Sequence, residues 1–259
     1  MDFETIGVDR EEEISFITLN RPESRNAIDM KMRKELVAAI DEIDEDKEAR
    51  VLVITGAGSS FCSGGDVKTM AGLDLVGRKE RIQILHEVIT KIQNIEKPVI
   101  AAVNGVAFGA GCSLVMASDL VIASEEASFS QAFLKVGLVP DCGAMFFLPR
   151  LLGLARTKEL FFTGDVLDAR RAEELGLINR VVPADSLMSE VKAMAHKLIS
   201  AAPLAMGLTK KILHKAMETS LSALLDYEVY AQGLCMQTED HQEGIRAFKE
   251  KRGPKFVGR

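Results

Sequence analysis

The sequence predicts an α/β protein, and two patterns carry that prediction. Up to about residue 183, segments rich in β-branched residues alternate with glycine turns and amphipathic helical stretches. From Ser186 onward, only helical stretches with apolar stripes follow. Apolar residues make up 47% and charged residues 27% of the 259 positions, which is typical of a soluble globular chain with a sizeable core.

The first elements can be placed from local patterns. Residues 14–19, ISFITL, predict a strand that stops at the turn-forming NRP. A helix is predicted to follow from Ile28, because apolar residues then recur at helical spacing among charged ones. These residues are Met32, Leu36, Ile40 and Ile43. Residues 50–58, RVLVITGAG, predict a buried strand that runs into a glycine loop.

A second amphipathic helix is predicted over residues 82–95 and stops before Pro98, where proline disfavours continuation. The strand PVIAAV (98–103) comes next, followed by a glycine-rich turn and a short apolar helix near SLVMA (113–117). Two short β segments, DLVIAS (119–124) and ASFS (127–130), complete this part.

The C-terminal part of the chain predicts helices only. Each helix carries an apolar stripe that must be buried against its own core or a neighbouring subunit. The boundary is placed near residue 200, giving a core of residues 1–200 and a helical region of residues 201–259. The helical stretches lie at 187–199, 204–217, 221–236 and 241–251.

Composition excludes several classes of protein. A net charge of −6 argues against nucleic acid as the main partner. No apolar run is long enough to cross a membrane and the acidic N-terminus lacks a signal peptide, so we expect a cytoplasmic protein. The cysteines at 62, 112, 142 and 235 form no CxxC pair, and the histidines form no HExxH. We therefore expect no metal site.

Two glycine-rich loops resemble nucleotide-binding loops without matching them. TGAGSSF (55–61) and FGAGCSL (108–114) both lack the third glycine of GxGxxG, and no Gly-Lys pair or GxSxG occurs. Glycines still let backbone N–H groups approach a ligand oxygen closely, and a helix N-terminus favours negative charge. FCSGGD (61–66) and GAGC (109–112) are therefore either an oxyanion-binding pair or two ordinary turns.

The stretch KVGLVPDCGAMFFL (135–148) holds a single carboxylate, Asp141, among apolar residues. Proline, aspartate and glycine together are ordinary turn chemistry, so Asp141 has a structural interpretation as well as a functional one.

Six segments, in this order and spacing, resemble the crotonase or enoyl-CoA hydratase/isomerase family over nearly the whole chain. They are NRPESRNAI (20–28), FCSGGDVK (61–68), KPVIAAVNGVAFGAGCSLVMASDLVIASEEASF (97–129), GLVPDCGAMFFLPRLLG (137–153), ARRAEELGLINRVVP (169–183) and EKRGPKF (250–256). The resemblance implies a spiral of ββα units followed by helices used in trimers or paired trimers. It also implies an enzyme without a tightly bound cofactor, whose substrate carries coenzyme A as a thioester.

The resemblance also implies roles for individual residues. The oxyanion donors would be the N–H groups of Gly65 and Ala110. Backbone near four residues would grip adenine and pantetheine, and three side chains would contact phosphate or adenine. The first group is Ala27, Ser63, Asp66 and Val67, and the second is Arg25, Lys255 and Phe256.

The reaction is where this chain departs from water-adding family members. These enzymes typically carry two glutamates, and here those places hold Ser113 and Phe133. Neither residue replaces a carboxylate that activates water or delivers a proton. Asp141 instead resembles the acid in the VPD segment of phenylacetate-type isomerases, in which one carboxylate suffices to move a double bond. We therefore favour an isomerase with Asp141 as proton shuttle.

Three alternatives stay open. The chain resembles aromatic acyl-CoA dehalogenases at His86 and Asp141, which allows hydrolytic chemistry with a nucleophilic aspartate. Hydration by an unusual route is a further possibility, and a non-catalytic acyl-CoA-binding subunit is the third. In all of them His86, Ser113 and Phe133 are expected to line the pocket.

Overall fold

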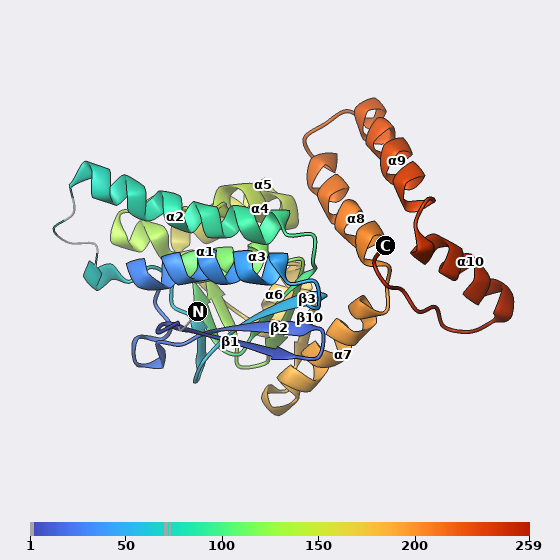
Figure 1. The fold of residues 1–259 in the computed structure, drawn as a ribbon. Helices are drawn as coiled ribbons and strands as arrows, with labels where there is room; N and C mark the ends of the chain where they lie inside the picture. The colour runs from blue at the N-terminus through green and yellow to red at the C-terminus, as the bar shows by residue number, and fades with distance from the viewer. Residues whose placement is uncertain (1–2, 70–71, 73) are drawn as a thin grey trace.

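The computed structural model describes residues 3–69, 72 and 74–259, which fold around two β-sheets (Figure 1). The larger sheet has six strands in the order β1-β2-β3-β5-β7-β10, and the smaller has four in the order β4-β6-β8-β9. The strands of the larger sheet are β1 (Ile6–Glu11), β2 (Ile14–Leu19), β3 (Val51–Gly56), β5 (Val99–Val103), β7 (Leu120–Ser124) and β10 (Arg180–Val182). Those of the smaller sheet are β4 (Ser60–Cys62), β6 (Val106–Phe108), β8 (Ser128–Ser130) and β9 (Val166–Asp168).

The chain passes from one sheet to the other and back in a spiral. Strand β3 continues into β4, β5 into β6 and β7 into β8. Helix α2 follows β4 after the short helix Val67–Thr69, and α3 follows β6 directly. Successive strands within each sheet pair in parallel, except β1 with β2 and β8 with β9. The helices are α1 (Met30–Glu45), α2 (Leu75–Asn94), α3 (Ala110–Ala117), α4 (Ala144–Leu152), α5 (Leu154–Thr163), α6 (Ala169–Leu175), α7 (Leu187–Ile199), α8 (Pro203–Ala216), α9 (Leu221–Cys235) and α10 (Glu239–Glu250). The predicted α/β spiral with C-terminal helices is confirmed.

The central strands are apolar on both faces because both faces are covered. In β3, Val51 and Val53 pack in the cluster that includes Val191 of α7. Leu52 and Ile54 point the other way, into the larger core formed with α1, α2 and α3. The periodicity of two along the strand thus sends alternate side chains into two separate cores.

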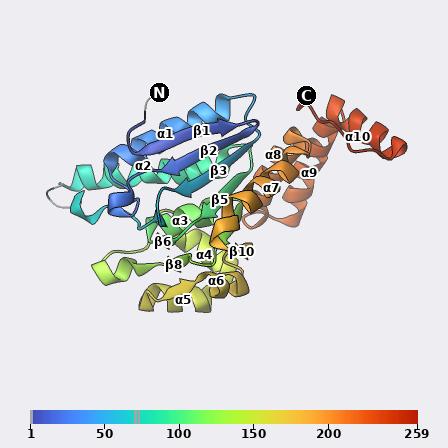
Figure 2. The same cartoon turned by 90° about the horizontal axis from the view of Figure 1, so that it is seen from below.

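Helices α8–α10 lead away from the sheets as an arm, coloured orange to red in Figure 1 and visible again in Figure 2. The turn between α7 and α8 spans residues 200–202, where the boundary of the helical region was predicted. No residue of α9 is buried, and Tyr227, Val229 and Tyr230 are among its exposed residues. The stripe of α9 is thus not buried against the core of its own chain.

No helix in the described ranges is both long enough and apolar enough to cross a bilayer.

A buried ion pair fastens the arm to the core. Lys210 of α8 donates to Asp119 at 2.7 Å, to the carbonyl of Ile92 at 2.9 Å and to that of Lys97 at 3.3 Å. The same carboxylate oxygen accepts the backbone N–H of Val99 at 2.7 Å. Burial lowers the pKa of Lys210, and the nearby charge of Asp119 opposes this shift. The pair therefore links α8 to the start of β5.

We predict that Lys210→Met lowers the free energy of unfolding by about 3 kcal/mol, because removing one partner of a buried pair leaves the other unpaired. The matched control is Lys211→Met, which removes an exposed ion pair to Glu96 and should cost no more than about 1 kcal/mol. Urea unfolding of both variants measures the difference. Equal losses would contradict the anchoring role of Lys210.

Candidate active site

Two backbone loops meet at the ends of β4 and β6. The first loop is residues 62–65, at the end of β4, and the second loop is residues 108–111, at the end of β6. These strands are parallel neighbours, so the loops that follow them emerge at the same edge of the sheet. An ideal Cβ placed on Gly64 would lie 2.9 Å from the oxygen of Phe108 and 3.6 Å from the nitrogen of Ala110. Gly64 also has φ +101°, a conformation that side chains rarely allow. Glycine at this position lets the loops approach each other.

The second contact between the loops is closer still. A Cβ on Gly111 would lie 2.3 Å from the carbonyl oxygen of Cys62 and 2.7 Å from its Cβ. Helix α3 can therefore begin against β4 only because Gly111 has no side chain. This contact fixes the position of the helix N-terminus relative to the first loop.

The amide groups of Gly65 and Ala110 are left available by this arrangement. Among the described residues, neither N–H group donates a hydrogen bond. Their neighbours do donate: the N–H of Asp66 bonds to the carbonyl of Ile28 at 3.0 Å, and that of Gly109 to Ser130 at 2.8 Å. Ala110 is also the first residue of α3, where the helix dipole favours negative charge. Two such amides at one edge can stabilise an oxyanion.

Asp141 lies beside the second loop. Its backbone oxygen accepts the Ser113 hydroxyl at 3.3 Å, and this hydroxyl also lies 3.2 Å from the carbonyl of Gly109. The turn interpretation holds for the Asp141 backbone, which accepts the N–H of Ala144 at 3.0 Å. The turn does not account for the side chain, because the carboxylate oxygen Oδ1 is buried and has no hydrogen-bond partner in the part of the chain that the structure describes.

The other two residues predicted to line the pocket differ in position. Phe133 is buried, and its ring would lie 3.6 Å from a Cβ on Gly109, so it packs against the glycine loop. His86 is exposed on α2. Leu85 and Ile89 lie on the buried face of that helix, and His86, the residue after Leu85, points away from this face. The structure does not bring His86 to the loops, and its pocket role stays a prediction.

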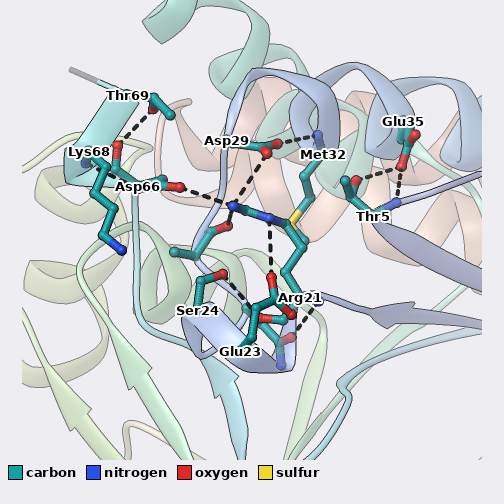
Figure 3. Close-up of polar contacts among 12 residues, drawn as sticks. Thr5, Arg21, Glu23, Ser24, Asp29, Met32, Glu35, Asp66, Lys68 and Thr69 are labelled. Carbon is teal, nitrogen blue, oxygen red and sulfur yellow. Dashed lines mark hydrogen bonds and ion pairs between the residues drawn. The ribbon is translucent and has the colours of Figure 1, made fainter. Parts of the chain in front are cut away.

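Two partly buried ion pairs support the first loop. Figure 3 shows Arg21 pointing between Asp29 and Asp66. The nitrogen-to-oxygen distances are 3.3 Å to Asp29 and 3.1 Å to Asp66. Arg21 also donates to the carbonyl of Ala27 at 2.6 Å. Sequence reasoning missed Arg21, although it lies inside the NRP segment that was read as a turn.

The predicted coenzyme A contacts fall into two groups. The N–H of Ser63 donates to the carbonyl of Arg25 at 2.9 Å, which places both beside Ala27 and Asp66. Val67 follows and is 60% exposed, at the start of the short helix Val67–Thr69. Arg21 in turn joins the carbonyl of Ala27 to the carboxylate of Asp66, so these segments adjoin the first loop.

Lys255 and Phe256 belong to the arm instead. The N–H of Lys255 donates to Glu243 at 3.1 Å, and the Phe256 ring packs near Gly244 of α10. Figure 1 shows α10 on the opposite side of the molecule from the N-terminus of α2. Within one chain these two residues do not reach the loops, and their contact with coenzyme A stays a prediction.

Sequence reasoning also missed two buried arginines. Arg33 of α1 is 3% exposed and Arg81 of α2 is 6% exposed. Arg33 donates to the backbone oxygen of Arg81, which in turn donates to Thr69 Oγ1 at 2.6 Å and to the backbone oxygen of Asp66 at 3.1 Å. A signal existed, because Arg33 precedes Leu36 and Ile40 by three and seven residues and so shares their inward face.

A comparison with protein families settles the wider assignment. The model of the family described as enoyl-CoA hydratase/isomerase matches residues 9–259. The chain belongs to this family. It is therefore an acyl-CoA-processing enzyme with the crotonase fold, and the family uses coenzyme A thioesters as substrates.

Individual relatives agree on the family and differ in reaction. Crotonyl-CoA hydratase from Syntrophomonas wolfei is 37% identical over 260 residues, covering 100% of both chains. The 1,2-epoxyphenylacetyl-CoA isomerase of Escherichia coli is 37% identical over 255 residues, covering 96% of this chain and 97% of the relative. The crystal structure of enoyl-CoA hydratase from Bacillus anthracis has a TM-score of 0.95 at 34% identity, covering 99% of this chain and 100% of that one. Hydratase names predominate among the relatives compared.

We predict that Gly111→Ala in this crotonase-family enzyme separates the two loops. Overpacking of this kind costs about 1–3 kcal/mol of stability. Displacing one oxyanion donor should lower kcat on the order of 10²-fold. Unfolding curves and enoyl-CoA assays test both effects.

Gly233→Ala is the control, because nothing lies within 4 Å of a Cβ at that helical site. It should raise stability by up to about 1 kcal/mol and leave kcat unchanged. Full activity in Gly111→Ala would show that the contact between Gly111 and Cys62 is dispensable.

Proposed function

We propose that this enzyme moves a C=C bond within an acyl-CoA thioester, with Asp141 as the proton shuttle. The observation that carries the proposal is the Asp141 carboxylate, whose buried Oδ1 has no hydrogen-bond partner among the described residues. Ser113 joins the backbone of Asp141 to that of Gly109, which brings the segment that carries the acid to the loop of one candidate oxyanion donor. An unpaired buried acceptor is costly to keep and calls for a functional explanation.

The chemistry needs one acid and two amides. Asp141 takes a proton from C2 of a 3-enoyl thioester, and the electrons of the broken C–H bond move toward the thioester carbonyl. The N–H groups of Gly65 and Ala110 hold the resulting oxyanion, for which such donors contribute about 3–4 kcal/mol each. The carboxylic acid of Asp141 then returns the proton to C4 while the double bond forms between C2 and C3. One proton leaves C2 and one proton is added at C4, so Asp141 is a carboxylate again at the end of the reaction.

The residues in place of the usual glutamates favour this reaction over hydration. Ser113 is fully buried, and its hydroxyl lies near two backbone carbonyls. Phe133 has no titratable group. Hydration requires one group that activates water and another that delivers a proton, whereas Asp141 is one group. The isomerase name of the E. coli relative is consistent with this proposal.

Hydration is the second candidate, and the names of the relatives favour it. Crotonyl-CoA hydratase is as similar in sequence as the isomerase is, at 37% identity for each. For this chain, hydration would require Asp141 to serve both steps in turn. Isomerisation requires only the transfer of a proton between two carbons, which one carboxylate can carry out.

We predict that wild-type enzyme incubated with a 3-enoyl-CoA in heavy water yields 2-enoyl-CoA and that Asp141→Asn is slower by about 10²- to 10⁴-fold. This is the usual contribution of a positioned acid or base. Mass spectrometry of the product follows the deuterium. Asp165→Asn removes an exposed carboxylate and serves as the control, with activity unchanged. Unaltered turnover in Asp141→Asn would rule out the shuttle.

A single turnover in ¹⁸O-labelled water separates shuttle from nucleophile. If Asp141 only moves a proton, we expect no label in the peptide that contains it. An aryl or alkyl ester on Asp141 would be hydrolysed by attack of water on the Asp141 carboxyl carbon, which leaves one labelled oxygen in the carboxylate. Peptide mass spectrometry reads this directly, and label at Asp141 would favour hydrolytic chemistry over the proposed isomerisation.

A further inference from the structure

Arg21 is joined to the candidate oxyanion donor Gly65 by a chain of two peptide groups. Its Nη1 donates to the carbonyl of Ala27 at 2.6 Å. That peptide also contains the N–H group of Ile28, which donates to the carbonyl of Gly64 at 2.8 Å. The Gly64 carbonyl belongs to the same peptide as the N–H group of Gly65. The guanidinium of Arg21 is therefore connected, through two hydrogen bonds, to the peptide that would hold the thioester oxygen.

This chain determines the direction of the Gly65 amide. The peptide between Gly64 and Gly65 is trans, so its C=O and N–H groups point in opposite directions. Because the Gly64 carbonyl faces Ile28, the Gly65 N–H group faces away from Ile28. The next peptide is held as well, since the N–H of Asp66 donates to the carbonyl of Ile28 at 3.0 Å. Ile28 and Gly65 thus form a parallel β-bridge, and turning the Gly65 amide would break it.

Arg21 also contacts the residue that follows each member of this bridge. Its guanidinium lies 3.1 Å from Asp66 Oδ2 and 3.3 Å from Asp29 Oδ2. Figure 3 shows the side chain between these two carboxylates. Asp66 follows Gly65, and Asp29 follows Ile28. A planar guanidinium presents several donors in a fixed geometry, so one group holds both strands of the bridge in register.

The turn that carries Arg21 is itself anchored. The side-chain oxygen of Asn26 accepts the N–H of Arg21 at 2.9 Å. The side-chain nitrogen of Asn26 donates to the carbonyls of Ala57 and Ser60 at 2.9 Å and 2.7 Å. Asn26 is fully buried and has φ +55°, a conformation that asparagine adopts more readily than most residues. The base of the Arg21 side chain is therefore fixed to the connection between β3 and β4.

We propose that Arg21 is a positioning residue that directs the Gly65 amide toward the thioester oxygen. This inference rests on the proposed function, in which that amide holds the oxyanion. Two carboxylates offset the charge of Arg21, so it acts on the amide through the bonded peptides and not through its own field. Hydrogen bonds in a chain also polarise one another, which makes the last N–H group a stronger donor.

The test observes the thioester carbonyl without turnover. Butanoyl-CoA labelled with ¹³C at the thioester carbonyl is a saturated probe, and amide donors that polarise its C=O bond lower the frequency of its infrared band. We expect the band of the probe bound to Arg21→Met to lie closer to its frequency in water than the band of the probe bound to wild type. The reason is that a misdirected Gly65 amide polarises the bond less. Isotope-edited infrared difference spectra measure this shift.

The kinetic effect should fall on kcat. We expect Arg21→Met to lower kcat for a 3-enoyl-CoA by about 10- to 100-fold, with little change in KM. Free coenzyme A, which has no thioester carbonyl, should bind Arg21→Met as tightly as wild type. Arg21→Lys keeps the positive charge without the planar set of donors, so its band and its kcat should fall between those of Arg21→Met and wild type.

Arg10→Met is the matched control. It also removes an ion pair between segments that are distant in sequence, in which Arg10 lies 3.0 Å from Asp46. The two side chains are 47% and 34% exposed, and neither belongs to the loops. This variant should have the infrared band, kcat and KM of wild type.

Two results would overturn the inference. The first is a wild-type band in Arg21→Met together with a lower melting temperature, because Arg21 would then have only a structural role. The second is an unshifted band with equally weakened binding of free coenzyme A and butanoyl-CoA, which would make Arg21 part of the coenzyme A surface. If Arg21→Met does not fold, the band of Arg21→Lys decides in the same way.

The inference and the proposed function can fail separately. If no variant isomerises a 3-enoyl-CoA but Arg21→Met shifts the band of the bound probe, the isomerase proposal fails and the role of Arg21 stands. If wild type isomerises the substrate through Asp141 but the band does not shift in Arg21→Met, only the inference about Arg21 fails.

Discussion

The close approach of two backbone segments, Cys62–Gly65 and Phe108–Gly111, is the constraint on which the site depends. Parallel pairing of β4 and β6 brings both segments to one edge, and Gly111 allows the last step of approach to the carbonyl of Cys62. Helix α3 then starts at a fixed place, with Ser113 one turn further on to hold the Asp141 backbone. The backbone of Asp141 is therefore positioned relative to the second loop by main-chain packing and a single hydroxyl.

This arrangement divides the work between backbone and side chains. The proposed oxyanion donors are backbone amides of Gly65 and Ala110, so they depend on the course of the main chain and not on the chemistry of a side chain. The acid or base can change independently, because it comes from a different segment. The chain has Ser113 and Phe133 where the family resemblance implies glutamates in water-adding enzymes, and it has Asp141 in a turn. Under the proposed function, the fold holds the thioester carbonyl, and the turn after the short helix Ala132–Val136 supplies the acid that sets the reaction.

The sequence predicts a structural feature well when nearby residues determine that feature, and poorly when distant segments determine it. Helix α1 follows from its helical periodicity, and strand β3 follows from a run of apolar, mostly β-branched residues that ends at a glycine loop. Helix α4 was not predicted, because Cys142 at φ +54° and Pro149 within the helix obscure its start and its middle. Strands of three residues such as β4 carry little pattern, and their partners decide them. Ion pairs between distant segments, such as Arg21 with Asp66, have no local sequence signal at all.

The buried arginines show the same limit and a way past it. A charged residue on the apolar face of a helix must satisfy its charge inside the protein or be excluded from the interior. Arg33 stands at such a position, so the helical pattern alone marks it as an exception, and the structure gives it the backbone oxygen of Arg81 as an acceptor. Asp141 is the matching exception in its own segment, a lone acid among apolar residues. The sequence marks both residues as exceptions, but the groups that surround each of them come from other segments and are fixed only by the fold.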